Sequence, residues 1–205
     1  MKIVFISDTH GKHRKADIPD GDILIHGGDV TNGRESQMLD FLNWLAELPH
    51  TYKIFIGGNM DRMLEVDSVQ YHKRLPENTF YLENEGIGLE GLQIWGSPMI
   101  PRFVGAFNRK RGEELRAYWE KIPEDVDILV THTPPSGILD RTSLGLSVGC
   151  KDLRRRVDEL HARFHLFGHV HEAYGKETHG GTTFVNGSFV RGFFQRFNVP
   201  FELEL

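Results

Sequence analysis

Residues 2–11 read K-I-V-F-I-S-D-T-H-G, an apolar run that ends abruptly in an aspartate, a threonine, a histidine and a glycine. β-Branched and aromatic residues bounded by a polar turn predict a buried β-strand at residues 2–7. Asp8 and His10 follow at the point where this strand ends. Ionisable side chains at the carboxyl end of a strand are typical of α/β proteins, in which ligands bind at that edge of the sheet.

The same pattern of a strand followed by polar side chains recurs four times along the chain. The strands are predicted at residues 22–26, 52–56, 126–131 and 164–167, and the side chains after them are Asp29, Asn59, His132, His169 and His171. Parallel strands of one sheet end at a common edge, so we expect the five exits to share one site. Apolar periodicity also predicts helices at 35–48, 111–121 and 153–160, and further strands within 79–95, 183–185 and 201–205.

The composition limits the partners that the protein can have. A chain of 205 residues with 39% hydrophobic residues can form one domain, residues 1–205, with a core of its own. The net charge of −5 offers no broad basic face, so we expect a small-molecule substrate and no nucleic-acid partner. Cys150 is the single cysteine and has no partner for an intramolecular disulfide. The apolar run 3–6 is too short for a membrane span or a signal peptide, and we expect a cytoplasmic protein.

The side chains at the strand exits form a donor set typical of a metal centre. They are imidazoles, carboxylates and one amide oxygen, without a thiolate: Asp8, His10, Asp29, Asn59, His132, His169 and His171. This set suits divalent Mn, Fe, Co, Ni or Zn and disfavours a structural zinc site. So many ligands exceed what one ion needs, and they predict two ions that share a bridging carboxylate. Asp29, between the two flanking sets, is the natural bridge.

Local backbone geometry favours the same prediction. In an extended segment residues i and i+2 point to the same side, so Asp8 with His10, and the His-x-His pair after the last exit, are expected to present paired ligands. Glycine also precedes a ligand at three exits and permits close approach of the backbone. These glycines are Gly28, Gly58 and Gly168. Each short motif alone is more often a turn or a cap, so the prediction depends on all five occurring in order.

The five blocks resemble the signature of the calcineurin-like metallophosphoesterase superfamily, which runs D-x-H, G-D, G-N-H-D/E, H and G-H-x-H. In this chain the blocks are Asp8-Thr9-His10, Gly28-Asp29, Gly58-Asn59-Met60-Asp61, His132 and Gly168-His169-Val170-His171. The resemblance implies an α/β fold in four layers, an αββα sandwich. It also implies a first metal held by Asp8, His10 and His171, a second metal held by Asn59, His132 and His169, and a bridge at Asp29.

Longer blocks resemble the branch of metallophosphoesterase-domain-containing proteins, several of whose members are phosphodiesterases. Examples are Trp95-Gly96-Ser97-Pro98, Thr131-His132-Thr133-Pro134-Pro135 and Phe184-Val185-Asn186-Gly187-Ser188. Other branches fit less well. The protein Ser/Thr phosphatases carry a second aspartate after G-D that is absent here, and the purple acid phosphatases carry a metal-binding tyrosine where this chain has Asn32.

One position departs from the signature. In the family, the histidine of G-N-H-D/E stabilises the phosphate and protonates the leaving group, and here its place is taken by Met60. A thioether neither donates a proton nor carries a charge, so we expect acid assistance to be missing while Asn59 still binds its metal. The alternative is that His13, shortly after the first block, replaces the acid. Ser97 and Asn186 are further candidates for contact with the substrate.

Together these features predict a bimetal-dependent phosphodiesterase with two divalent ions, Mn²⁺ first among them. The expected nucleophile is a hydroxide that bridges the metals, with the ligands Asp29 and Asn59 as the catalytic residues. The expected substrates are nucleotide-type or activated phosphodiesters, and the site should work best on activated esters, whose leaving group needs no proton. Two alternatives remain: a phosphomonoesterase that acts on a small metabolite, and a nucleotide-binding or scaffold protein in which catalysis has faded.

Overall fold

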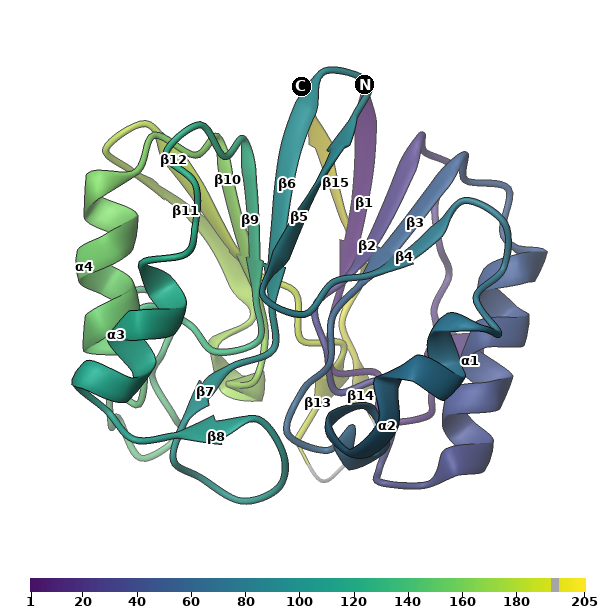
Figure 1. Cartoon of the computed structure of the whole chain (residues 1–205), viewed down its shortest axis with the longest axis horizontal. Coiled ribbons are helices and arrows are strands. Elements are labelled where there is room, and N and C mark those ends of the chain that lie inside the picture. The colour runs from purple at the N-terminus through teal and green to yellow at the C-terminus, as the bar shows by residue number, and fades with distance from the viewer. Residues whose placement is uncertain (193–195) are drawn as a thin grey trace.

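The strand that opens the chain lies inside a five-stranded sheet. The computed structural model describes residues 1–192 and 196–205 (Figure 1). The order of the first sheet is β15–β1–β2–β3–β4, with the bounds Phe201–Glu204, Lys2–Ile6, Ile23–His26, Tyr52–Phe55 and Thr79–Tyr81. Strands β1 to β4 are parallel, and β15 pairs antiparallel with β1.

A six-stranded sheet faces the first one (Figure 1). Its order is β11–β12–β10–β9–β6–β5, with the bounds Gly175–His179, Thr182–Asn186, Phe164–Phe167, Ile128–Thr131, Leu92–Ser97 and Glu85–Leu89. The four central strands are parallel, and each edge strand is antiparallel to its neighbour. Two short pairs lie at the end of the sandwich opposite both termini: β7 with β8, at Ile100–Pro101 and Asn108–Arg109, and β13 with β14, at Val190–Arg191 and Arg196–Phe197.

Helices cover the outer face of each sheet (Figure 1). On the first sheet lie α1 (Glu35–Glu47) and α2 (Arg62–His72), and on the second lie α3 (Glu113–Trp119) and α4 (Lys151–Glu159). Single 3₁₀ turns follow β1 and β10, namely η1 (His13–Lys15) and η2 (His171–Ala173). The layers are helix, sheet, sheet and helix, which confirms the predicted αββα sandwich. Among the described helices, none has both the length and the apolar character needed to cross a membrane.

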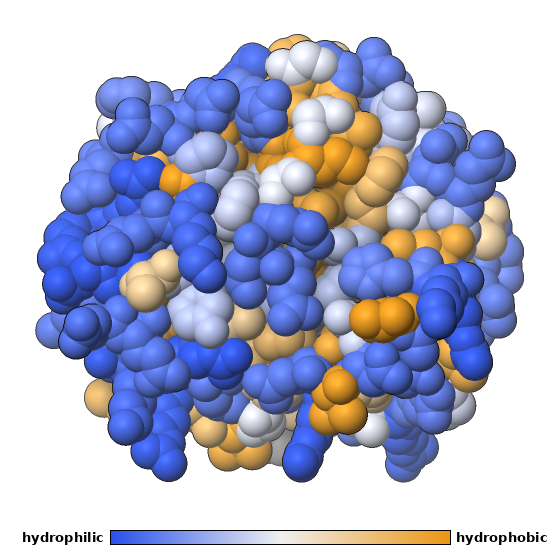
Figure 2. Space-filling view, in the orientation of Figure 1, coloured by the Kyte–Doolittle hydropathy of each residue, from blue (hydrophilic) through white to orange (hydrophobic). Residues whose placement is uncertain are grey.

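Burial on both faces explains why the strands read as continuous apolar runs. In β1, Ile3 and Phe5 belong to the cluster between the two sheets, whereas Val4 and Ile6 belong to the cluster on the helix-facing sides. All four side chains are fully buried. Alternate side chains of a strand point to opposite faces, so a strand between a helix layer and a second sheet must be apolar on both. Figure 2 shows hydrophobic surface along the seam between the sheets near β5.

The strand exits come from two sheets, and the expectation of one common sheet is wrong. β1, β2 and β3 belong to the first sheet, whereas β9 and β10 belong to the second. The exits still meet, because the parallel strands of both sheets end on the same side of the sandwich. The strands predicted within 79–95 divide in the same way, since β4 pairs with β3 while β5 pairs with β6.

The helices follow the sequence pattern unequally. α1 ends at Glu47, close to the predicted end, because Pro49 disfavours a helical residue before it. α3 is shorter than the predicted 111–121 segment. The apolar pattern does not predict α2, in which only Leu64 and Tyr71 are buried and Asp67 interrupts the helix with φ −155° and ψ 78°.

Candidate metal centre

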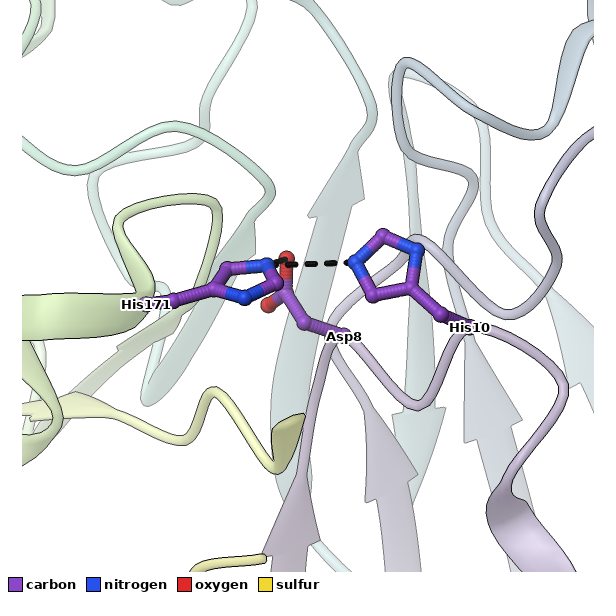
Figure 3. Close-up of side chains that lie close together, drawn as sticks. All are labelled: Asp8, His10 and His171. Carbon is purple, nitrogen blue, oxygen red and sulfur yellow. Dashed lines mark hydrogen bonds and ion pairs between the residues drawn. The ribbon is translucent and has the colours of Figure 1, made fainter. Parts of the chain in front are cut away.

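The first cluster of potential ligands joins the exits of β1 and β10 (Figure 3). Asp8 and His10 follow β1, and His171 begins η2 after β10. His171 Nε2 lies 3.4 Å from Asp8 Oδ1 and 3.1 Å from His10 Nε2. Each residue offers one ligand atom, and these atoms lie within 4.8 Å of one another. They are therefore close enough to bind one ion together.

The second cluster shares Asp8 with the first and adds Asp29 and His132. His132 Nε2 lies 3.5 Å from Asp29 Oδ1 and 3.2 Å from Asn59 Oδ1. The other oxygen of Asp29, Oδ2, lies 3.8 Å from His10 Nε2. Asp29 thus faces a histidine of each cluster with a different oxygen, which is the arrangement that a bridging carboxylate needs.

His169 lies beside the second cluster. Its ring centroid is 5.0 Å from that of His132, with the ring planes at 65°. Its backbone N–H donates to both carboxylate oxygens of Asp8, at 3.1 and 3.0 Å. Burial lowers the pKa of His169 to about 4, so the imidazole is neutral at pH 7 and can act as a ligand. Through these contacts the predicted ligands form one connected group.

The turns that carry the ligands are not extended, so the reason given for pairing Asp8 with His10 is wrong. β1 ends at Ile6, and φ is 53° at Asp8 and 47° at His10, in the left-handed region. Asp29 and His169 share this conformation, with φ of 51° and 69°. Such values are uncommon in residues other than glycine and are strained, so surrounding contacts must hold them. The left-handed turns bend the chain sharply at each exit, which lets short loops bring ligands of both sheets together.

The glycines before the ligands permit the close approach that the sequence predicts. A Cβ atom on Gly168 would overlap Asp8 Oδ2 and Ser7 Oγ, and a Cβ atom on Gly58 would overlap Asp29 Oδ1. Any larger residue at either position would have to displace a carboxylate of the centre.

The histidine tautomers leave lone pairs that face oxygen atoms. His10 Nδ1 lies 3.3 Å from Thr31 O, and His132 Nδ1 lies 2.9 Å from Gly27 O. A carbonyl oxygen only accepts, so each Nδ1 must carry the hydrogen and each Nε2 of the neutral ring has a lone pair. Both Nε2 atoms face oxygens of Asp29. An Nε2 lone pair and a carboxylate oxygen that face one another need a cation between them, either a proton or a metal ion, and this donor set fits divalent metal ions.

The pKa values of the buried carboxyl groups also favour a site for divalent metal ions. Burial opposes ionisation, but the hydrogen bond from His171 and the charge of His132 hold the pKa of Asp8 well below its ordinary value. Burial likewise opposes charge on Asp29, and His132 nevertheless lowers the pKa of that carboxyl group. Burial opposes protonation of His132, yet Asp29 raises its pKa to about 9, so a proton holds the place between Nε2 and Asp29 when no metal ion is bound. The buried carboxylates thus draw positive charge into the site, which a divalent ion would supply.

Hydroxyl groups hold Asp8 from behind. Ser7 Oγ donates to Asp8 Oδ2 at 2.6 Å, and Ser188 Oγ lies 3.1 Å from the same oxygen. Asn186 Oδ1 accepts from the N–H of Ser188 at 3.1 Å, and Asn186 Nδ2 donates to Val170 O at 2.9 Å. Sequence reasoning missed Ser7 and Ser188, although both lie in the quoted blocks. Asn186, a predicted substrate contact, is fully buried in this network and supports Asp8 through Ser188.

Two other predicted substrate contacts are also engaged elsewhere. Ser97 is fully buried, and its Oγ donates to Asn84 Oδ1 at 2.8 Å. His13 is buried under α1, where its Nε2 lies 3.0 Å from Asp40 Oδ2 and its ring packs against aromatic residues of the helix. The structure therefore does not bring His13 into contact with the predicted ligands, and the alternative acid at this position is not supported.

Met60 contributes to the centre through its backbone. Its N–H donates to Asp29 Oδ1 at 2.8 Å, an interaction that any residue except proline can make. Asp61, which follows it, accepts hydrogen bonds from the backbone N–H groups of Val30 and Thr31 at 3.0 and 2.9 Å. Burial raises the pKa of Asp61 to about 7, and these donors offset part of that effect. Position 60 thus keeps its hold on Asp29 without an imidazole.

Known proteins resemble this chain in sequence and in structure. The model of a family described as calcineurin-like phosphoesterase matches residues 1–173. Human and mouse proteins named metallophosphoesterase domain-containing protein 1 are each 38% identical to the chain over 230 aligned residues, covering 100% of this chain and 71% of the relative.

Solved structures share the fold at low sequence identity. One superposes with a TM-score of 0.70 at 18% identity and covers 91% of this chain and 90% of its own. A protein of Thermus thermophilus superposes with a TM-score of 0.60 at 15% identity, covering 91% of this chain and 88% of its own. The matched segment 1–173 includes every strand exit from Asp8 to His171. The chain belongs to the calcineurin-like phosphoesterase family, whose members hydrolyse phosphate esters and generally bind two divalent metal ions.

Proposed function

We propose that the protein is a bimetal-dependent phosphodiesterase that acts on activated or nucleotide-type diesters. In this proposal one ion is held by Asp8, His10 and His171, the other by Asn59, His132 and His169, and Asp29 bridges them. The observation that supports it most directly is the pair of Nε2 atoms that face Asp29 from two sides, each left to bind a cation because the other ring nitrogen is bonded to a carbonyl oxygen. Mn²⁺ is our first choice, because mixed imidazole and oxygen donors suit borderline to hard ions.

The chain's own residues fix the charges of the centre before a substrate arrives. Bound divalent ions would supply an activated water and positive charge for the phosphate oxygens. Asp29 is held by the N–H of Met60, and Asp8 is held by Ser7 and by the N–H of His169. Charges that are already oriented stabilise a transition state without further reorganisation.

Met60 sets which leaving groups the proposed enzyme accepts. Its side chain has no proton to donate, and the buried His13 is bonded to Asp40. Esters whose leaving group departs as a stable anion, such as aryl phosphodiesters, are therefore the substrates that this site can hydrolyse fastest.

The test is the initial rate of Mn²⁺-loaded protein on bis(4-nitrophenyl) phosphate and on a 3′,5′-cyclic nucleotide, with metal-free protein as the control. We expect metal-dependent hydrolysis of the aryl ester. The cyclic nucleotide should react at least about 100-fold more slowly, because a positioned general acid typically contributes about 10²- to 10⁴-fold. Comparable rates on both would overturn the role assigned to Met60.

A second candidate is a nucleotide-binding protein that keeps the fold and the metals without turnover, and the missing acid at Met60 favours it. Bound metal with no hydrolysis of either diester would support this candidate over the first. A phosphomonoesterase is distinguished by its rate on 4-nitrophenyl phosphate, since our proposal requires the diester to react faster than the monoester.

A further inference from the structure

A pocket of about 400 Å³ opens beside the metal centre, and His169 forms part of its wall. Loops from distant parts of the sequence meet there, represented by Phe103, Arg111, Thr133 and Val148. Because His169 belongs both to this wall and to the predicted ligands, a group that fills the pocket would lie next to the phosphorus atom of a bound ester.

Phe103 is an aromatic wall residue left open to solvent. It follows β7 and is 64% exposed, whereas most large apolar residues of the chain are buried. Its ring meets that of His169 edge-to-face, with a centroid distance of 5.4 Å and planes at 89°. This contact keeps the ring beside the centre, where it borders a pocket that another aromatic group can enter.

Arg111 holds another part of the pocket lining in place. Its Nη1 donates to Gly149 O and its Nη2 to Val148 O, each at 2.9 Å. The guanidinium group thus ties the loop that precedes α4 to the segment that precedes α3. The pocket is therefore shaped before a ligand binds, which reduces the entropy lost on binding.

The remaining lining combines apolar and polar side chains, with an excess of positive charge. Pro101 and Val170 supply apolar contacts, and Arg102 and Arg111 outnumber the single acidic residue of the lining, Glu172. A guanidinium group stacks on an aromatic face, and its charge also attracts a phosphodiester anion. This combination favours a ligand that is both anionic and aromatic.

We propose that this pocket binds a planar aromatic group on the non-leaving side of a phosphodiester and selects it over an aliphatic group of the same size. The inference rests on the proposed phosphodiesterase function. A planar ring gains an aromatic contact with Phe103 and a cation–π contact with Arg102 beyond the apolar area it buries. A saturated ring gains only the area.

The test compares phenyl 4-nitrophenyl phosphate with cyclohexyl 4-nitrophenyl phosphate, which share a leaving group and differ in the planarity of the other group. We expect the KM of the phenyl ester to be lower by about two- to tenfold, the usual range for an added aromatic contact. Phe103→Leu should bring the two KM values closer together, leaving the difference that Arg102 contributes, and Phe103→Tyr should keep them apart. Val104→Ala is the matched control, because Val104 is the exposed neighbour of Phe103 and does not line the pocket.

Binding without turnover separates this inference from the proposed function. Calorimetry on metal-loaded protein should show tighter binding of phenylphosphonate than of cyclohexylphosphonate, and Phe103→Leu should reduce the difference. If hydrolysis proceeds but Phe103→Leu changes neither the KM ratio nor the affinity ratio, the inference is overturned and the function stands. If phenylphosphonate is preferred through Phe103 but neither diester is hydrolysed, the pocket stands and the proposed function is overturned.

Discussion

The two sheets supply the candidate metal centre with different chemistry. The first sheet brings the oxygen donors together with one imidazole, at Asp8, His10, Asp29 and Asn59, and the second brings only imidazoles, at His132, His169 and His171. Each cluster of potential ligands combines residues of both sheets. The carboxylates are almost inaccessible, whereas the side chain of His171 is 24% exposed. The buried negative charge of Asp8 and Asp29 is thus tolerated because the second sheet offers imidazoles that can share a cation with these carboxylates.

Asp8→Asn is the strongest test of the role of the first sheet's carboxylates, since Asp8 belongs to both clusters of potential ligands. The amide keeps the shape of the side chain and removes its charge. We expect activity to fall to the level of metal-free protein, a loss of at least about 100-fold, because residues that merely support ligands typically contribute about 10- to 100-fold. Metal content after dialysis and the rate on bis(4-nitrophenyl) phosphate measure the effect. Asp125→Asn, at an exposed position, is the control, and full metal content in Asp8→Asn would contradict the assignment.

Met60→His adds a second imidazole, beside that of His10, to the residues that the first sheet contributes. We expect it to raise the hydrolysis of diesters with alkoxide leaving groups by about 10²-fold, the lower end of what a general acid contributes, and to leave aryl esters nearly unchanged. Rates on a cyclic nucleotide and on bis(4-nitrophenyl) phosphate measure the two effects. Met63→His, three residues along in α2, is the matched control. An unchanged rate on the cyclic nucleotide in Met60→His would show that the missing general acid at position 60 does not limit hydrolysis.

Gly168→Ala tests how closely the loop after β10, in the second sheet, must approach Asp8 of the first sheet. The new Cβ atom would overlap Asp8 Oδ2 and displace the carboxylate. We expect metal affinity to fall by about 10- to 100-fold, as when a group that supports a ligand is lost. Gly88→Ala in β5 is the control, because its Cβ atom would make only ordinary contact with Gln93. Equal metal affinity in the two variants, measured by competition with a chelator, would show that the approach is not required.

A buried histidine lies inside each sheet, His26 in β2 and His165 in β10. Their Nε2 atoms lie 3.0 Å and 2.8 Å from the hydroxyl groups of Thr9 and Thr131. Burial lowers the pKa of both histidines from 6.5 to about 3. Between these pH values the unfolded chain binds a proton at each position that the native protein does not, so stability decreases as the pH falls below 6.5.

His165→Gln removes one of these protonation differences. At pH 5 each buried neutral histidine lowers the free energy of unfolding by about 2 kcal/mol, at roughly 1.4 kcal/mol per pH unit. The variant should therefore lose about 2 kcal/mol less than the wild type between pH 7.5 and pH 5, measured by urea unfolding of metal-free protein. The exposed His161 offers the control His161→Gln. Parallel pH profiles for wild type and His165→Gln would show that His165 does not remain neutral in the native protein.

The sequence predicts the parts of the centre that depend on local pattern. A strand followed by a polar turn is local, so Asp8, Asp29 and His132 are all found at strand exits as expected. Which sheet each strand joins is decided by pairing between distant segments, and periodicity does not encode it. The left-handed turns escape prediction for a related reason, because contacts from the opposite sheet stabilise them, such as the bond from the N–H of His169 to Asp8.

Single side chains were harder to place than elements. His13 is only three residues from His10, yet η1 turns it under α1, where Asp40 is its partner. Asn186 has the polarity of a substrate contact, but it is fully buried behind Asp8. In both cases the deciding partner is distant in sequence, and the residue type alone is compatible with either role.

The pairing of β15 with β1 has a consequence for how the protein acquires its activity. Lys2 lies opposite Glu204, and the N–H of Ser7 donates to Gly187 O at 2.9 Å, so the strand that delivers Asp8 is completed by residues far along the chain. Contacts of such long sequence separation form slowly and late. A nascent chain still lacking residues 186–204 would have every predicted metal ligand but would lack Ser188, whose hydroxyl group lies 3.1 Å from Asp8 Oδ2. Metal loading should therefore await the folding of this segment, which ties the onset of activity to the completion of the first sheet.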